Sequence, residues 1–473
     1  MEAIKAQRNQ KKGFTILGQD MDVILAVFGN IVSWMVRQFV PSLLPRLLPA
    51  IDEEDTSDTP SRDQTKCIAI GRPGGSEQLR VITLKPGYAT AGYNIGSPTL
   101  FVDVSSSLPK DTVVVKVAAF SVNFADCCIR WGLYESANKF VGWPIVPGFD
   151  IAGTIEQVSE DYSGDFKVGD KVYGATFFGS YSTRVLVPTK QLRKLPSNLT
   201  MAQAAAVPAV SLTALYSLHL GGQFPPGVAM TPKNNNNNNN GVDHKRKQSI
   251  LIHSAAGGVG SMLVQMSKLL GMSQVVGVVG STSKVQTARE LNCDVIIDKS
   301  KQNLWEAAKE ASPDGYHVIA DANGVSTLQA SFDHLAATGR LIVFGFHSNL
   351  PMGSDMLHPW AWWNMIVKMI YMPKFDTMDL VTRNRSILGF NLSFFVDEIG
   401  LLVQFYEQIS DWLQKGLLKV PHVVEMNMKD ISKAHELIQS GKSVGKIVMM
   451  TEEDDGGKTA TTTSETYGSK KAQ

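Results

Sequence analysis

The sequence lacks the features that mark several large classes of protein. Only four of its 473 residues are cysteines, and none of these stand in a C-x-x-C pair, which excludes a disulfide framework and a zinc site of four thiolates. Lys and Arg number 45 against 44 Asp and Glu, so no charge bias favours nucleic acid or an acidic partner. Even the charge-free residues 23–36 are fewer than the roughly twenty that a helix needs to cross a bilayer. We therefore expect a protein of a reducing compartment such as the cytoplasm, without a nucleic-acid partner.

The first 62 residues form an extension that does not have the pattern of a folded core. Residues 23–36 place apolar side chains on one helical face, three prolines follow by residue 49, and acidic residues 52–55 begin a linker. Three interpretations remain open: an anchor in a membrane interface through residues 21–50, a targeting sequence, or a segment docked on the protein's own surface. We favour association with a membrane or organelle surface over self-docking.

The centre of the chain has the pattern of a strand, a glycine turn, a helix and a second strand. An apolar strand at residues 250–254 leads into the turn at 255–260, and an apolar helix at 262–270 leads to a strand at 275–279. This is the first unit of a dinucleotide-binding fold, with N–H groups at the helix start that favour phosphate. A purely structural glycine turn is the disfavoured alternative. The residues that we expect to bind the cofactor here are Ala256, Gly257, Gly258, Val259 and Gly260.

The end of the second strand predicts which cofactor is bound. NAD-selective enzymes place Asp or Glu about twenty residues past the glycine turn, where it holds the ribose hydroxyls. Here the strand is followed by Ser281, Thr282 and Lys284, and the next acidic residue along the chain is Glu290. Two hydroxyl donors and a cation suit a 2′-phosphate, so we expect NADPH rather than NADH. The alternative is that Lys284 is merely a solvated residue at the start of the next helix.

Alternating strand and helix patterns continue after residue 284. Apolar strand patterns predict a parallel sheet, and helical patterns lie between them. Asn323, Phe344 and Gly345 fall at the carboxyl ends of two of these strands, where doubly wound folds bind ligands. We therefore add these three residues to the cofactor site and assign residues 206–384 to a doubly wound Rossmann domain.

The half of the chain that precedes this domain has a different pattern. Short β-branched strands between turn residues predict a small barrel, and residues 202–218 predict one helix, kinked at Pro208, that leads to the cofactor domain. Residues 223–247 include seven consecutive asparagines and predict a disordered insert. The polar residues 451–473 predict a disordered tail. For the vicinal cysteines at 127 and 128, one buried and one surface thiol is favoured over a redox pair.

Three motifs in order along the chain resemble the medium-chain dehydrogenase/reductase superfamily. They are Asn123-x-x-Asp126 followed by Arg130-x-Gly132-Leu133-Tyr134, then Pro147-Gly148-x-Asp150-x-Ala152-Gly153, then the glycine turn. Within the superfamily they are most similar to the zinc-independent quinone oxidoreductases, over about residues 65–450. Residues 359–364, 384–392 and 441–448 resemble the branch of vesicle amine transport protein homologues, the synaptic vesicle membrane proteins.

The resemblance implies an α/β protein with two domains. A GroES-like β-barrel catalytic domain would comprise residues 63–205, completed by residues 385–450, and the doubly wound Rossmann cofactor domain would be inserted between them. Trp360, Trp362 and Trp363 are expected to pack in a core or an interface rather than to contact substrate.

The resemblance also implies roles for individual residues. Zinc enzymes of the superfamily have Cys where Asn123 stands and His where Phe149 stands, so no metal is expected. Asn123 would donate a hydrogen bond to a developing oxyanion. Tyr134 would either relay a proton or form an apolar wall with a satisfied hydroxyl, and both roles remain open. Asp126 is expected to be a structural cap, and Lys446 to contact the cofactor.

The expected activity is therefore transfer of a hydride from NADPH to a quinone or an α,β-unsaturated carbonyl, by a homodimeric enzyme that needs no metal. The competing hypothesis belongs to another class of protein. It is a membrane-associated scaffold of the vesicle protein type that binds NADPH and turns over little.

Overall fold

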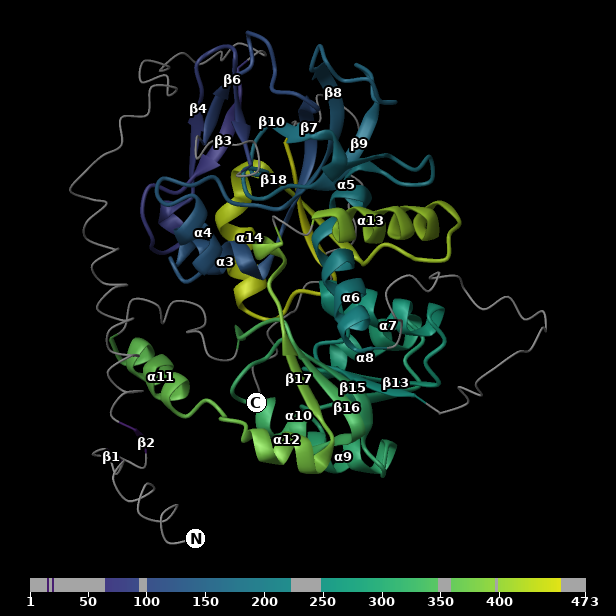
Figure 1. The fold of residues 1–473 in the computed structure, drawn as a ribbon. Coiled ribbons are helices and arrows are strands. Elements are labelled where there is room, and N and C mark those ends of the chain that lie inside the picture. Colours follow the sequence, from purple (N-terminus) through teal and green to yellow (C-terminus); the bar gives the residue numbers. More distant parts are fainter. Residues whose placement is uncertain are drawn as a thin grey trace, which may run out of the picture.

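The computed structural model describes residues 15–16, 19–20, 64–92, 100–222, 248–347, 359–395 and 399–451. The predicted disordered insert lies outside these residues. So does the predicted disordered tail, except for Thr451, which donates hydrogen bonds to the carbonyls of Val117 and Ala118. The predicted N-terminal extension also lies outside them, apart from four residues. Those four pair β1 (Thr15–Ile16) antiparallel with β2 (Gln19–Asp20). The remaining described chain forms a barrel domain and a Rossmann domain, one above the other in Figure 1, as the predicted fold class requires.

The barrel domain is organised around β7 (Thr112–Val122), a β-branched strand that is buried along most of its length. One edge of β7 pairs antiparallel with β8, and the other pairs first with β10 and then with β19 (Lys446–Met450). The last described strand of the chain thus completes the sheet of the first domain. The other strands of this sheet are β5 (Tyr88–Ala91), β6 (Phe101–Asp103), β8 (Asp150–Val158), β9 (Lys171–Ala175), β10 (Arg184–Pro188), β11 (Leu192–Lys194) and β18 (Val423–Asn427). A separate pair is formed by β3 (Lys66–Ala69) and β4 (Arg80–Thr83).

The Rossmann domain contains a six-stranded parallel sheet with the order β14-β13-β12-β15-β16-β17. The first strand, β12, lies between β13 and β15, so the chain winds outward in both directions and the strand order reverses beside β12. This is the doubly wound arrangement that the sequence predicts. The strands are β12 (Ser249–Ile252), β13 (Gln274–Val279), β14 (Val295–Asp298), β15 (Tyr316–Asp321), β16 (Leu335–Val343) and β17 (Ser386–Gly389).

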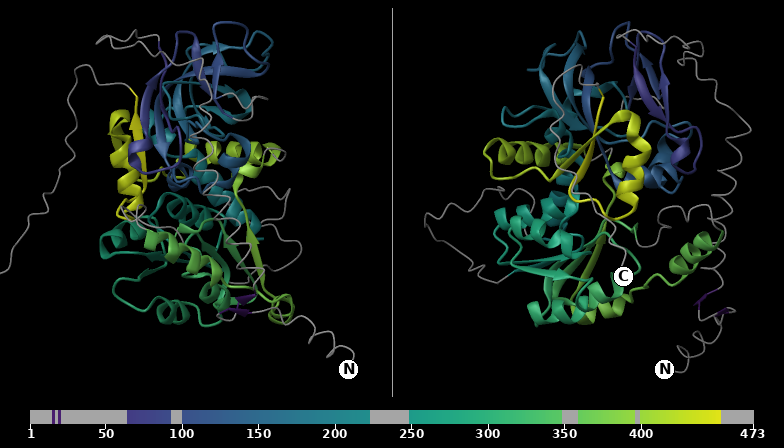
Figure 2. Two further views of the ribbon diagram at one scale, coloured as in Figure 1. Left: turned by 90° about the vertical axis from the view of Figure 1, so that its left-hand side faces the viewer. Right: turned by 180° about the vertical axis from the view of Figure 1, so that it is seen from behind.

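Helices flank this sheet and the barrel (Figures 1 and 2). The helices of the Rossmann domain are α7 (Gly258–Leu269), α8 (Val285–Glu290), α9 (Leu304–Ala311), α10 (Leu328–Asp333) and α12 (Thr377–Arg383). Those of the barrel domain are α3 (Phe124–Arg130), α4 (Glu135–Phe140) and α14 (Ile431–Gln439).

The connection between the domains differs from the single kinked helix that the sequence predicts. The structure has α5 (Met201–Ala205) and a separate α6 (Pro208–Leu220). Pro208 is the first residue of α6, where its missing N–H is tolerated because first-turn N–H groups have no partner within a helix. α5 packs on barrel strands β7 and β8, and α6 packs on α7 of the Rossmann domain. The domains therefore divide between these two helices.

The second crossing between the domains lies further along the chain than the predicted boundary at residue 384. β17 pairs with β16, so the Rossmann sheet continues to Gly389. α13 (Ile399–Gln414) then packs against α6, and β18 and β19 return to the barrel. One apolar core cluster includes barrel residues such as Tyr173 together with Leu215, Met262 and Trp412 from α6, α7 and α13. This shared core fixes the two domains against each other, and with them any site at their junction.

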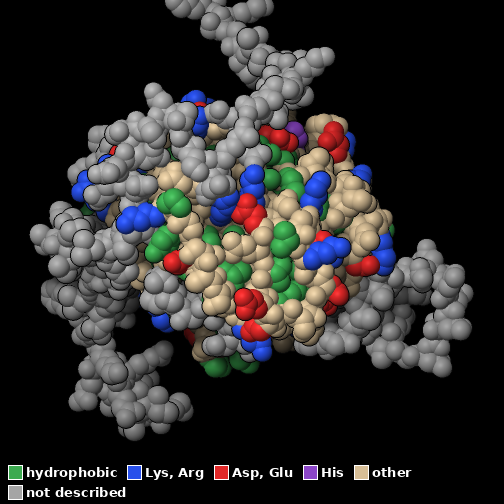
Figure 3. Space-filling model, turned by 90° about the horizontal axis from the view of Figure 1, so that it is seen from above, with side chains coloured by type: hydrophobic (Ala, Val, Ile, Leu, Met, Phe, Trp, Pro, Cys, Tyr) green, Lys and Arg blue, Asp and Glu red, His purple; other side chains and the backbone are tan. Residues whose placement is uncertain are grey.

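The described surface carries mixed charge and one unusual helix. No helix among the described residues is long and apolar enough to span a membrane. On the face in Figure 3, basic and acidic side chains of the described residues are interspersed. α11 (Pro359–Ile370) stands off both domains (Figures 1 and 2) and exposes 70% of Trp360 and 54% of Trp363. Packing of these two tryptophans in a core of this chain is therefore wrong, while packing in an interface stays a prediction.

Candidate active site

The glycine turn after β12 has the backbone geometry that the sequence predicts. Gly257 caps α7, and the helix begins at Gly258. A Cβ added at Gly260 would overlap the carbonyl oxygen of Ser254 and lie 2.8 Å from the Cα of Ala255. Only glycine therefore allows this approach of the helix to the end of the strand. The start of α7 is open to a phosphate, and its use by a cofactor stays a prediction.

The barrel closes directly on this turn through the start of β19. Gly445 forms a bridge with Gly257, and the N–H of Gly445 donates to the Ala256 carbonyl over 3.1 Å. Gly445 has a φ of +68°, and a Cβ there would overlap the carbonyl of His422. These contacts bring Lys446 against Gly258, where an added Cβ would lie 3.0 Å from the lysine Cδ. Lys446 therefore lies beside the glycine turn, and its contact with the cofactor stays a prediction.

The buried Lys446 holds one end of the Asn123 amide. Its Nζ donates to Asn123 Oδ1 over 2.6 Å and lies 3.5 Å from Asp150 Oδ2. Asp150 Oδ2 in turn accepts from Asn123 Nδ2 over 2.8 Å, so the amide is fixed at both ends. Burial lowers the pKa of Lys446, whereas the negative charges of Asp150 and Asp126 act in the opposite direction. Among the described residues, Nδ2 makes only this hydrogen bond, which leaves its second N–H for a ligand.

Asp150 was not assigned a role from the sequence, although it lies in one of the motifs that carry the resemblance. The structure places this carboxylate fully inside the protein, where it also accepts from Ser121 Oγ over 2.5 Å and from the Ala209 N–H over 2.6 Å. Ala209 is in the first turn of α6, so Asp150 connects the barrel to the helix that enters the Rossmann domain. The motif that contains Asp150 could have marked the residue as important, but a motif does not show which distant groups the carboxylate contacts.

Asp126 is the structural cap that the sequence predicts. Its Oδ2 accepts from the N–H of Asn123 over 2.7 Å, which completes a capping box at the start of α3, and from Tyr181 Oη over 3.0 Å. Its Oδ1 accepts from the N–H of Gly148 over 3.1 Å. Burial raises the pKa of Asp126 to about 7, although these hydrogen bonds favour the charged form. Asp126 therefore fixes the backbone of Asn123 at the start of α3.

Tyr134 has a satisfied hydroxyl in the structure. Its Oη donates to Asn391 Oδ1 over 3.1 Å and lies 3.0 Å from Ser393 Oγ. Its ring makes an edge contact with Phe149, with centroids 6.0 Å apart. Burial raises the pKa of Tyr134 to about 12, so the phenol keeps its proton at neutral pH. These contacts agree with the wall interpretation, and the proton relay stays a prediction; Asn391 and Ser393 were not predicted as site residues.

The end of β13 brings two lysines together. Lys284 Nζ donates to the Gly441 carbonyl over 2.8 Å, and burial together with the positive charge of Lys299 lowers the pKa of Lys284. Lys299, which follows β14, was missed from the sequence because it lies far from the glycine turn along the chain. Thr282 Oγ1 donates to Asp298 Oδ2 over 2.6 Å, so this predicted phosphate donor already has a partner. Lys284 and Lys299 still fit a 2′-phosphate, although the Asp298 carboxylate lies beside Thr282.

The carboxyl ends of β15 and β16 bring the remaining predicted cofactor residues together. Buried Asp321 accepts from the N–H of Asn323 over 2.7 Å, and a Cβ added at Gly345 would lie 2.8 Å from the Ala322 carbonyl. Phe344 follows β16, and its N–H donates to the Asp321 carbonyl over 3.1 Å. Asn323 is only 4% exposed, and its Oδ1 has no partner among the described residues. An unpaired buried acceptor in this crevice fits the N–H groups of a nicotinamide carboxamide.

The described residues include no group of three His, Cys, Asp or Glu that could hold a metal ion. Asn123 and Phe149 stand at the positions where the resemblance places two zinc ligands in other enzymes, and neither an amide nor a phenyl ring is a usual zinc ligand. Activity without zinc stays a prediction.

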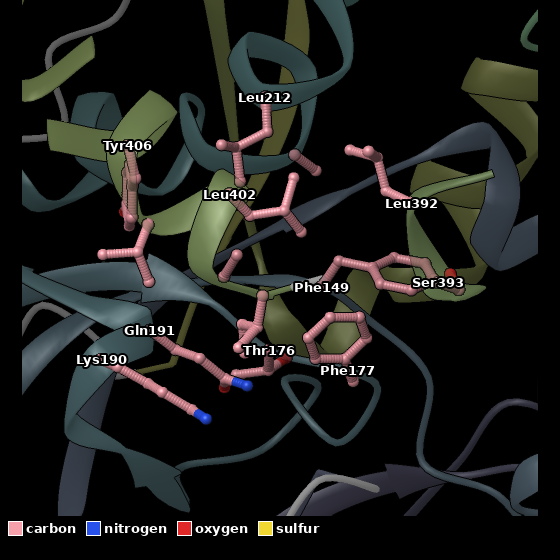
Figure 4. A pocket seen from close by; sticks show the side chains of 14 residues that line it. Phe149, Thr176, Phe177, Lys190, Gln191, Leu212, Leu392, Ser393, Leu402 and Tyr406 are labelled. Atoms are coloured by element: carbon pink, nitrogen blue, oxygen red, sulfur yellow. The ribbon is translucent and has the colours of Figure 1, made fainter. Parts of the chain in front are cut away.

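An apolar pocket borders the proposed catalytic residues. It is a hollow of about 570 Å³ that is continuous with solvent. It reaches Phe149, which contacts the ring of Tyr134, and Ser393, which contacts its hydroxyl. Figure 4 shows side chains from the barrel, α6 and α13 converging on this space. The further lining residues are Ala175, Thr176, Phe177, Lys190, Gln191, Ala209, Leu212, Leu392, Ile399, Leu402, Val403 and Tyr406.

Two protein-family profiles match the chain. Residues 109–197 match an alcohol dehydrogenase GroES-like domain, and residues 258–408 match a zinc-binding dehydrogenase. The two matches cover the barrel and the Rossmann domain in the order that the fold requires.

Individual proteins are also similar to this chain. The synaptic vesicle membrane protein VAT-1 homolog of Danio rerio is 28% identical over 73% of this chain and 65% of its own length. The chloroplastic NADPH-dependent alkenal/one oxidoreductase of Arabidopsis thaliana is 30% identical over 54% of this chain and 62% of its own. The solved structure of a Pseudomonas syringae quinone oxidoreductase has a TM-score of 0.61 and 26% identity, and the match covers 82% of this chain and 100% of that one. The match thus spans just under two thirds of the length of the Danio rerio and Arabidopsis thaliana proteins.

Proposed function

Since the chain belongs to the medium-chain dehydrogenase/reductase superfamily, in the branch of quinone oxidoreductases and VAT-1 homologues, we propose that it transfers a hydride from NADPH to a quinone or an α,β-unsaturated carbonyl. The observation that carries this proposal is the Asn123 amide, held between Lys446 and Asp150 beside the glycine turn. A relative that is named for NADPH-dependent alkenal and alkenone reduction supports the same reaction class and cofactor. No metal takes part in the proposed reaction.

NADPH, when bound, supplies the hydride. The residues that would hold it are those of the glycine turn, Lys284 and Lys299 at the 2′-phosphate, and Asn323 at the carboxamide. The shared apolar core and the closure of β19 on the turn would keep the barrel groups close to the reacting ring. Such positioning is a large part of the catalysis in hydride transfer.

The role of Asn123 follows from where negative charge develops during the reaction. The hydride adds to the β-carbon of the enone, the electron pair of the C=C bond moves to the carbonyl oxygen, and the α-carbon then takes a proton from solvent. The enolate oxygen needs a hydrogen-bond donor during this step. The free N–H of Asn123 can provide it, and the Lys446 cation on Oδ1 polarises the amide and strengthens that donor.

Steady-state NADPH oxidation with a panel of quinones and 2-enals tests the proposal. We expect turnover that persists after treatment with a chelator. Because the donor acts mainly in the transition state, Asn123→Ala should lower kcat roughly a hundredfold with a smaller change in KM. Absence of turnover with every acceptor, or loss of turnover on removal of zinc, would contradict the proposal.

The second candidate function is a membrane-associated scaffold that binds NADPH and turns over little. The names of the vesicle membrane protein relatives favour it, as do the exposed Trp360 and Trp363 on α11, since tryptophan is preferred at membrane interfaces. Liposome flotation combined with the acceptor panel separates the two: rapid turnover supports the reductase, whereas NADPH binding and flotation without turnover support the scaffold. In either case we propose a homodimer that is cytoplasmic or attached to an organelle surface.

A further inference from the structure

The apolar pocket beside Tyr134 is elongated, because its lining comes from the barrel, from α6 and from α13 (Figure 4). Its walls are mostly side chains of leucine, phenylalanine, alanine, isoleucine and valine, and they extend from Phe149 to α13. Ser393 and Phe149, which both contact Tyr134, place one end of the pocket beside this proposed catalytic residue. Sites of this kind bury most of the surface of a ligand and use a few polar groups to orient it. The space therefore suits an acceptor with an apolar tail.

Two polar atoms in the lining of this pocket have no partner among the described residues. Gln191 is 7% exposed and Tyr406 is 2% exposed, yet Gln191 Nε2 and Tyr406 Oη make no hydrogen bond. Figure 4 shows the Gln191 amide projecting beside Lys190 at the end of the pocket away from Ser393. A buried donor without an acceptor costs about 1–3 kcal/mol. Gln191 lines the pocket, so a rotation of its amide toward the hollow would let a ligand oxygen accept from Nε2 and remove that penalty.

We propose that the pocket binds the tail of the acceptor, and that the tail is an unbranched apolar chain with a hydroxyl or carbonyl oxygen at its far end. This inference rests on the proposed reductase function and specifies its substrate class. Gln191 Nε2 donates to the distal oxygen, and Leu212 and Leu402 line the apolar part. The redox step is unchanged: the hydride adds to the β-carbon, the C=C electron pair moves to the carbonyl oxygen, a proton reaches the α-carbon, and the distal oxygen does not react.

The test compares two long acceptors, trans-2-decenal and the same enal with a terminal hydroxyl. We expect the wild type to have a higher kcat/KM with the hydroxylated enal. Gln191→Leu keeps the approximate size of the side chain but removes the donor, so the ratio of the two kcat/KM values should fall roughly tenfold. The matched control is Gln286→Leu on the exposed side of α8, which should leave the ratio unchanged. An unchanged ratio in Gln191→Leu would overturn the inference.

A second measurement does not depend on turnover. Isothermal titration with 1,10-decanediol, which carries no enal and cannot be reduced by hydride transfer, reports tail binding in the wild type. We expect Gln191→Leu to weaken this binding roughly tenfold, and we expect Leu402→Trp to abolish it because the larger ring fills the pocket. Reduction of acrolein by the wild type separates the two proposals. If acrolein is reduced but the diol does not bind, the pocket inference is wrong. If no quinone or enal of the panel is reduced while the diol binds, the proposed function fails and the pocket remains.

Discussion

Lys446 is a cation held in the interior by two acidic residues and an amide. Its side chain is 4% exposed, and its Nζ contacts Asn123 and lies close to Asp150. Burial disfavours the charged form of an ammonium group, but the negative charges of Asp150 and Asp126 stabilise it. Burying this ammonium group costs free energy, and a functional role explains why the cation is there: it fixes and polarises the Asn123 amide.

The cofactor preference is predicted to depend on a single lysine at the end of β13. Lys284→Glu should weaken NADPH roughly ten- to a hundredfold and NADH much less, since a charge-assisted contact to the 2′-phosphate is replaced by repulsion. Dissociation constants for both cofactors, measured by titration of intrinsic fluorescence, would show this. Lys309→Glu on the exposed surface of α9 is the matched control. Equal affinity of the wild type for NADPH and NADH would contradict the prediction.

Asp126 predicts a pH dependence of stability. Its pKa is raised to about 7 by burial, whereas an unfolded chain releases the same proton near pH 4. The folded protein therefore binds more protons than the unfolded chain in this window, and the free energy of unfolding should fall as pH rises through it, by up to about 1.4 kcal/mol per pH unit. Urea denaturation at several pH values should show this slope in the wild type and a flatter one in Asp126→Asn, which cannot ionise. The same slope in both proteins would contradict the assignment.

The residues that could be predicted from the sequence are those whose roles are local. The glycine turn and the Asp126 cap each depend on neighbours a few positions away, and the structure has both. The contact between Lys446 and Asn123 joins residues 323 positions apart, and that between Tyr134 and Ser393 joins residues 259 positions apart. No periodicity records such contacts, because they depend on how two domains and a returning strand pack together. The resemblance implied that Lys446 lies near the cofactor, but it did not show that Lys446 contacts Asn123.

Among the elements, the junction of β12 and α7 is under a tight steric constraint. Gly260→Ala should destabilise the protein by about 1–3 kcal/mol and weaken NADPH, because the new Cβ would overlap the backbone at Ser254 and push the helix start away. Thermal unfolding and cofactor titration measure both effects. Gly400→Ala is the control, since it lies in α13 with no atom within 4 Å of the added Cβ and should be neutral or stabilising. If the Gly260→Ala protein were as stable as this control, the close approach of α7 to the Ser254 backbone would not contribute to stability.

The element boundaries show where local patterns are insufficient. Residues 202–218 are mostly apolar, and their pattern predicts one helix with a kink at Pro208. The break between α5 and α6 arises because α5 packs on the barrel and α6 packs on the Rossmann domain. β17 was likewise separated from the Rossmann domain, because a four-residue strand after a long connection carries too little pattern to show which sheet it joins. In both cases packing between distant elements decides the boundary.

At the scale of the whole molecule, the core clusters of the described residues account for both domains. The main clusters of the barrel and of the Rossmann domain begin at Cys67 and contain residues of both crossings between the domains. Deletion of residues 1–62 should therefore leave the melting temperature and NADPH affinity nearly unchanged while reducing association with liposomes. Differential scanning fluorimetry and flotation would measure these effects. A truncated protein that fails to fold would show that the extension is part of the core.

The open edge of the Rossmann sheet predicts how a homodimer forms. β17 pairs only with β16 among the described strands, so its outer backbone groups can pair with a second copy about a two-fold axis. The Phe390 N–H donates to Val343 on β16, so by the alternation of a strand the N–H of Gly389 faces outward. The exposed tryptophans of α11 would add apolar contact area to such a dimer.

This arrangement can be tested with two substitutions at one position. Gly389→Pro removes an outward N–H without removing a side chain, whereas Gly389→Ala keeps that N–H, and an added Cβ would come no closer than 3.7 Å to another atom. Light scattering after size-exclusion chromatography should give a dimeric mass for the wild type and the alanine variant, and a shift toward monomer for the proline variant. NADPH affinity should remain in all three, because two strands, β15 and β16, separate β17 from β12 and the glycine turn that follows it. A monomeric wild type, or a proline variant that dimerises as tightly as the alanine variant, would rule out pairing through β17.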